Sequence, residues 1–110
     1  MSQQVKSRER VAAHGEVFTA EREVKAMCNL VAEECRDYKA TFLEPACGDG
    51  NFLIEILTRK LISIMGDSDY ERKSLIALSS LYGIDILPDN VIACRRRLRE
   101  LWEAGYEHSF

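Results

Sequence analysis

The sequence predicts an α/β fold in which short parallel strands are flanked by helices, the opening of a doubly wound sheet. Three observations lead to this prediction. Segments with helical and strand patterning follow one another in the order helix, strand, helix, helix, strand, helix. A glycine-rich turn, Gly48-Asp49-Gly50, directly follows the first strand segment and opens a helix. The 110 residues are 46% hydrophobic and 30% charged, which is the balance of one ordinary globular domain.

The first half of the chain is predicted to contain a helix and a strand before the turn. Residues 1–13 are polar and lack a clear period, so we expect a loose arm or a short leading helix. Apolar residues at helical spacing predict a helix over 21–38, with Thr19 as its N-cap. Residues 41–44 are predicted to form a strand, which Pro45 ends.

The second half repeats the alternation of helix and strand. A helix over 51–65 is expected to end at Gly66, because glycine is the usual residue just after a helix. A third helix over 68–81 opens with Ser68 and Glu71, which have the spacing of a capping box. The remaining predicted elements are a strand over 82–86 and a last helix that has Pro88 at its first position.

Composition excludes several classes of protein. No apolar run approaches the length of a membrane helix, and the polar start MSQQVKSRER is unlike a secretion signal, so we expect a cytoplasmic protein without a membrane partner. The cysteines form no Cys-x-x-Cys pair or Cys/His cluster, so reduced thiols and no metal site are expected. The net charge of −3 places any DNA contact on a local patch or on another segment.

The segment around the glycine turn carries the strongest indication of a binding site. Small residues let a ligand approach the backbone closely, and main-chain N–H groups at a helix start can bind a polar or anionic group. Glu44, at the end of the strand, suits a cationic amine and not a phosphate. The glycine spacing also matches neither the dinucleotide fingerprint nor the lysine-bearing P-loop.

Three short segments together resemble the N6-adenine DNA methyltransferases of the restriction–modification type. Glu-Pro-Ala-Cys-Gly-Asp-Gly-Asn-Phe-Leu at 44–53 resembles the cofactor-binding motif of that family. Gly-Glu-Val-Phe-Thr-Ala at 15–20 resembles its Gly-x-x-Phe-Thr-Pro motif, with Ala20 in place of proline, and Tyr-Gly-Ile-Asp-Ile at 82–86 resembles its second-strand motif. The resemblance spans roughly residues 14–102. It implies a partial Rossmann-like, class I methyltransferase fold over 14–110, with S-adenosylmethionine as cofactor.

The resemblance also implies roles for individual residues. Phe18 and Thr19 would contact the methionine moiety of the cofactor, and Glu44 would meet its α-amino group. Asp85 would accept hydrogen bonds from the ribose hydroxyls, so Asp85→Ala is expected to weaken cofactor binding while leaving the fold intact. The complete set of implied cofactor-binding residues is Phe18, Thr19, Glu44, Ala46, Cys47, Gly48, Asp49, Gly50, Asp85 and Ile86.

Two members of this set have simpler readings. Asp49 is either a turn former or a cofactor contact. Cys47 is expected to be a small turn residue, because no histidine partner for a nucleophile is identifiable. The basic run at 95–97, with Arg99, is expected to be a solvated helix face that binds a partner more readily than DNA.

The motif that marks methyl transfer in this family, Asp/Asn-Pro-Pro-Tyr/Phe, is absent. The only prolines, Pro45 and Pro88, are not adjacent, and no target-recognition region is recognisable. We therefore expect no catalytic residue in this chain and no activity from it alone, with DNA bound through other segments of the enzyme. The chain would be a fragment, a truncated gene product or half of a split enzyme. The alternative is a non-catalytic assembly module that pairs with itself or with a separate catalytic chain.

Overall fold

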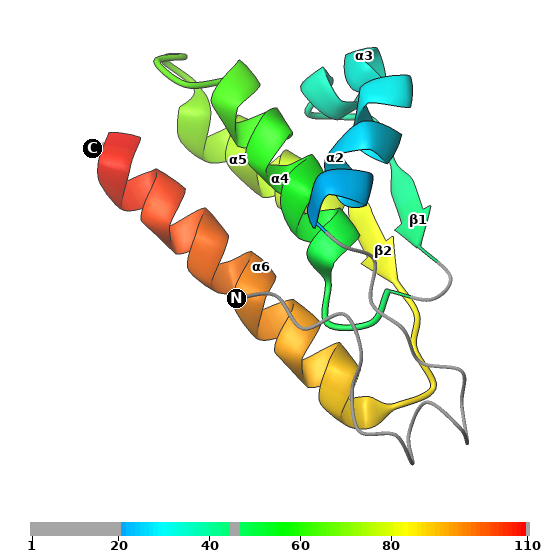
Figure 1. Cartoon of the computed structure of the whole chain (residues 1–110). Coiled ribbons are helices and arrows are strands. Elements are labelled where there is room, and N and C mark those ends of the chain that lie inside the picture. The colour runs from blue at the N-terminus through cyan, green and yellow to red at the C-terminus, as the bar shows by residue number, and fades with distance from the viewer. Residues whose placement is uncertain (1–20, 45–46, 110) are drawn as a thin grey trace.

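The fold is mainly helical. The computed structural model describes residues 21–44 and 47–109, and 69% of these residues are helical. The elements, in chain order, are α2 (Glu21–Leu30), α3 (Ala32–Arg36), β1 (Phe42–Glu44), α4 (Asn51–Ser63), α5 (Tyr70–Ser79), β2 (Leu81–Gly83) and α6 (Pro88–Ser109) (Figure 1). The predicted arm at 1–13, the Thr19 cap and the motif at 15–20 lie outside the described residues.

The predicted fold class is therefore wrong. In place of a Rossmann-like α/β fold, the described residues form a helical assembly around one sheet of two short parallel strands. The physical reason is the length of the strand segments: each strand has three residues, whereas the amphipathic segments around them form helices of up to 22 residues. Two strands this short bury little surface, so the main core lies between helices.

The first predicted helix, over 21–38, is two helices. Val31 interrupts it with a non-helical conformation, φ −123° and ψ 40°. The backbone nevertheless stays in register, because the Val31 N–H donates to Cys28 O and the Cys35 N–H donates to Val31 O. This break lets α2 and α3 direct both cysteines into the core, where each is fully buried.

Helix α4 is the centre of the molecule. Its buried aliphatic residues recur at helical spacing, namely Leu53, Ile56, Leu57 and Leu61. Helices α2, α3, α5 and α6 all pack against it (Figure 1). Full burial of each such side chain contributes about 1.5–3 kcal/mol, so this one helix supplies much of the apolar stabilisation. The helix ends at Ser63, two residues earlier than predicted, and Gly66 follows its C-cap Ile64 two residues later in the left-handed conformation at φ 82°.

The start of α5 differs from the predicted capping box. The N-cap residue is Asp69 and not Ser68, and its side chain makes no capping hydrogen bond. Instead, Asp67 Oδ1 accepts the Asp69 N–H at 2.7 Å, and Asp67 Oδ2 pairs with Lys73 Nζ at 2.5 Å. A carboxylate is a stronger acceptor than a hydroxyl, so Asp67 organises this turn and the helix starts at Tyr70.

Among the described residues, the core packs against one face of the sheet. Phe42 and Leu81 are partner residues on the two strands and pack against the core under α4. The next pair, Leu43 and Tyr82, points the opposite way and is 61% and 54% exposed. Strand β2 begins at Leu81, one residue earlier than predicted, and is shorter than the predicted 82–86.

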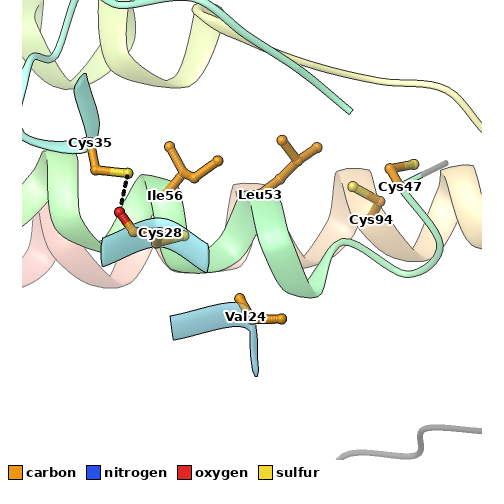
Figure 2. Close-up of a cluster of buried hydrophobic side chains, with 7 residues drawn as sticks. All are labelled: Val24, Cys28, Cys35, Cys47, Leu53, Ile56 and Cys94. Carbon is orange, nitrogen blue, oxygen red and sulfur yellow. Dashed lines mark hydrogen bonds between the residues drawn. The ribbon is translucent and has the colours of Figure 1, made fainter. Parts of the chain in front are cut away.

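Four cysteines lie in one apolar cluster. Figure 2 shows Cys28 and Cys35 from the α2–α3 break at one end, and Cys47 and Cys94 at the other, with Leu53 and Ile56 of α4 between them, near Val24. All four are free thiols. The Cys28 and Cys35 side chains both pack in this cluster.

A buried lysine joins α4 to the beginnings of both strands. Lys60 is fully buried, and its Nζ donates to Ala40 O, just before β1, and to Ser80 Oγ, just before β2, at 2.7 Å. The amine also lies over the Phe42 ring, 5.1 Å from its centroid. Burial lowers the pKa of Lys60 below its ordinary value. The lysine therefore binds both strands at the end opposite to the glycine turn.

Candidate functional site

The parallel sheet brings the two predicted motif segments together. Because β1 and β2 are parallel and in register, with Glu44 opposite Gly83, their carboxyl ends meet at one edge. Hydrogen bonding continues past the strands: the Ile84 N–H donates to Glu44 O at 3.0 Å, and the Cys47 N–H donates to Ile84 O at 2.9 Å. Glu44, the glycine turn and Asp85 therefore lie at the same edge of the sheet.

The turn itself needs glycine at two positions. Gly48 and Gly50 have φ values of 55° and 98°, a region that other residues rarely adopt. A Cβ on Gly50 would also lie 2.7 Å from Cys94 Sγ, so a side chain there would collide with α6. The Gly50 N–H donates to Cys47 O at 2.9 Å, which closes the turn directly before α4 begins at Asn51.

Asp85 links the turn to α6. Its Oδ2 accepts the Gly48 N–H at 3.0 Å, while its Oδ1 accepts the Leu87 N–H at 2.8 Å and Asn90 Nδ2 at 3.2 Å. Asn90 is fully buried. A carboxylate has about four acceptor positions, and contacts among the described residues use three of them. Asp85 therefore has a structural role, which the motif comparison did not predict.

Cys47 is an unreactive thiol in this setting. It is buried beside Cys94, its Sγ donates to Gly48 O at 3.5 Å, and the two sulfur atoms lie together in Figure 2. Burial raises the pKa of Cys47 to about 12, with the neighbouring Cys94 and Asp85 adding to the effect. A thiol with this pKa stays protonated near neutral pH and is a poor nucleophile. Its small side chain fits the packed space below the turn.

Asp49 faces α6. Its Oδ1 lies 3.3 Å from Arg97 Nη1, and the same nitrogen donates to the Asp49 main-chain oxygen at 3.1 Å. Of the two interpretations left open by the sequence, this geometry favours the turn former. The sequence did not indicate that Arg97 and Asn90, both on α6, contact this site. For Asn90 a signal was present, because it follows Asp85 closely enough for a local side-chain hydrogen bond.

The other members of the predicted set differ in what the structure describes. Glu44 is half-buried at the end of β1, and Ile86 is 75% exposed just beyond β2. Phe18, Thr19 and Ala46 lie outside the described residues. The structure therefore describes Glu44, the glycine turn and Asp85, whereas Phe18, Thr19 and Ala46 are assigned by the resemblance alone.

No family model matches the chain, and neither does any curated protein or solved structure. Among the residues that the structure describes, no group of three or more histidine, cysteine, aspartate or glutamate side chains could hold a metal ion. No helix in the same ranges has the length and apolar character needed to cross a membrane. The function must therefore be argued from the residues and their geometry.

Proposed function

We propose that this chain forms the S-adenosylmethionine-binding portion of a DNA adenine N6-methyltransferase. The observation that carries the proposal is the hydrogen bond from the Gly48 N–H to Asp85 Oδ2, 3.0 Å long. It joins two segments far apart in sequence, each of which resembles a different cofactor motif of that family. Ligands of parallel sheets bind beyond the carboxyl ends of the strands, and both segments lie there.

The residues present fit the polar groups of this cofactor. Glu44 places a carboxylate, which suits an amine, at the end of β1, and within the described residues the Asp85 carboxylate has one acceptor position that suits a ribose hydroxyl. When bound, S-adenosylmethionine would supply an electrophilic methyl group on its sulfonium. Phe18 and Thr19 complete the proposed site on the strength of the motif alone.

We propose cofactor binding alone for this chain, with methyl transfer and DNA recognition carried out by other segments of the enzyme. The chain has no Asp/Asn-Pro-Pro-Tyr/Phe motif, so we propose that it is inactive alone. Its outward arginines are partly neutralised, because Arg96 pairs with Glu100 and Arg99 pairs with Glu103 on α6. The free, buried thiols fit the reducing conditions of the cytoplasm, where we propose that the enzyme acts.

Calorimetric titration of the full chain with S-adenosylmethionine tests the proposal. We expect saturable binding that Glu44→Gln weakens roughly tenfold to hundredfold, the usual effect of losing a hydrogen bond to a charged group. Glu33→Gln, an exposed change on α3, should leave the affinity unaltered. Adenosine triphosphate should not compete, because Glu44 repels phosphate. Absence of saturable binding by the wild-type chain, or equal losses in the two variants, would refute the proposal.

A second candidate function is assembly through the outer face of the sheet. Leu43, Tyr82 and Ile84 are exposed there, although parallel sheets are normally covered on both faces. An open hollow beside this face is lined by Lys39, Thr41, Arg72, Leu75, Ile76, Ser79, Ser80 and Tyr82. The hollow lies at the amino ends of the strands, away from the glycine turn, so the two candidate functions use separate surfaces.

Light scattering over a wide range of protein concentration tests this second candidate. If a second copy of the chain covers the sheet, the protein should dimerise at high concentration, and Tyr82→Glu should abolish the dimer. Ile92→Glu, an equally exposed apolar position on α6, is the matched control. A chain that stays monomeric at every concentration excludes self-association and leaves a separate catalytic chain as the partner of this face.

A further inference from the structure

The arginine-rich segment of α6 is divided between solvent and the candidate site. Arg96 is directed outward, with 60% of its side chain exposed, and pairs with Glu100 at 3.7 Å. Arg97 is directed toward the glycine turn, with 36% exposed. Its Nη1 donates to Asn51 Oδ1 at 2.8 Å, in addition to its two contacts with Asp49. One guanidinium group thus holds both residues that flank Gly50.

The glycine turn needs such external contacts to keep one conformation. Gly48 and Gly50 both lack a side chain that would limit their backbone angles, so the free turn has many accessible shapes. Asp85 fixes its first half through the Gly48 N–H. The second half is held by Arg97, which binds the Asp49 carbonyl oxygen at 3.1 Å. Both restraints come from the segment that runs from the end of β2 into α6.

The charge of Asp49 gives the contact a further function. Asp49 Oδ1 is buried and accepts no hydrogen bond within the described structure, so the nearby guanidinium supplies its charge compensation. Without that cation, the buried carboxylate oxygen would be driven toward water, because an uncompensated buried charge is costly. Movement of Asp49 would carry along the peptide groups on both sides, which line the proposed cofactor site.

We propose that Arg97 is a positioning residue of this site, which holds the turn in the shape that binds the cofactor. This inference rests on the proposed function. Arg97 acts through Asp49 and Asn51, and the ligand contacts remain with the turn and with Asp85. The printed contacts of Arg97 are all made by Nη1, whose N–H groups have fixed directions in the guanidinium plane. A lysine ammonium keeps the charge without that fixed geometry, so it replaces arginine only in part.

Three variants of the full chain test this role: Arg97→Gln, Arg97→Lys and the control Arg96→Gln. Amide hydrogen exchange reports the turn through the Gly50 and Ile54 N–H groups, which donate to Cys47 O and Gly50 O. We expect Arg97→Gln to accelerate exchange at both about tenfold, which corresponds to 1.4 kcal/mol, while exchange in α5 stays unchanged. Calorimetry should give a matching loss of S-adenosylmethionine affinity for Arg97→Gln, a smaller loss for Arg97→Lys, and no loss for Arg96→Gln.

The possible outcomes separate the two proposals. A wild-type chain that binds no cofactor refutes the proposed function, and Arg97 then positions nothing, whatever the exchange rates. If the wild type binds but Arg97→Gln binds equally well, the proposed function survives and the positioning role is refuted. A loss of affinity that accompanies faster exchange throughout the chain, α5 included, reflects general destabilisation and also refutes it. If Arg97→Gln does not fold, Arg97→Lys decides by the same criteria.

Discussion

Asp85→Ala should destabilise the fold as well as the site. The substitution removes the acceptor of hydrogen bonds from the Gly48 N–H, the Leu87 N–H and Asn90 Nδ2. Gly48 and Asn90 are buried, so water does not readily replace the lost partner. A buried N–H left without an acceptor costs about 1–3 kcal/mol, and with the two further hydrogen bonds lost we expect a total of about 3 kcal/mol. The expectation from the motif alone, that the fold stays intact, is replaced by this one.

Urea and thermal denaturation followed by circular dichroism measure this loss. For a domain of this size, about 3 kcal/mol corresponds to a decrease in Tm of roughly 10–20 °C. Asp85→Asn keeps one acceptor oxygen and should lose roughly half as much. The control Glu100→Ala removes a carboxylate from an exposed pair on α6 and should change stability by less than about 0.5 kcal/mol. If Asp85→Ala and Glu100→Ala have equal midpoints, the three hydrogen bonds do not stabilise the fold and our reasoning is wrong.

Two further predictions concern packing and pH. Gly83→Ala would place a Cβ 2.9 Å from both Cys47 Cβ and Leu53 Cδ1, so it should lower the free energy of unfolding by about 1–3 kcal/mol in urea denaturation. An unchanged midpoint would show that the neighbouring side chains move to make room for the methyl group. Burial raises the pKa of Cys28 and Cys47 to about 12, above the ordinary 9.0. The folded chain therefore holds these two thiol protons more tightly than the unfolded chain does. Stability should be intact below pH 9 and fall as pH rises from 9 toward 12, by about 1.4 kcal/mol per thiol and pH unit, and Cys28→Ala should flatten this slope.

Local patterns predicted the parts of the fold that local chemistry determines. The helix α4 and its end close to Gly66 followed from apolar spacing and glycine preference, and Pro88 opens α6 as expected. The fold class could not be predicted in this way, because short apolar runs do not reveal how long a strand will be. The break at Val31 likewise depends on the packing of two helices against α4, which is absent from any local window.

The candidate site shows the same division. The strand, turn and helix start around Gly48 followed from the motif, as did the proximity of Asp85. The hydrogen bonds and ion pairs that these residues make could not be predicted, because they join residues far apart in the sequence. Arg97 follows the outward Arg96 directly in the sequence, and only the path of α6 past the turn distinguishes the two. A resemblance to a motif indicates which residues lie close together, whereas the structure shows which of their atoms already make hydrogen bonds within the protein.

The parallel pairing of β1 and β2 has a consequence for the order in which the protein folds. A parallel pair cannot close through a short hairpin, so Phe42 meets Leu81 only after α4 and α5, which lie between them, have folded into the connection. Lys60 strengthens this dependence, because its amine reaches both strands from α4. During synthesis the Asp85 restraint on the glycine turn can form before the Arg97 restraint, because Asp85 precedes α6 in the chain. The second half of the turn therefore depends for its shape on α6, the last helix of the described residues.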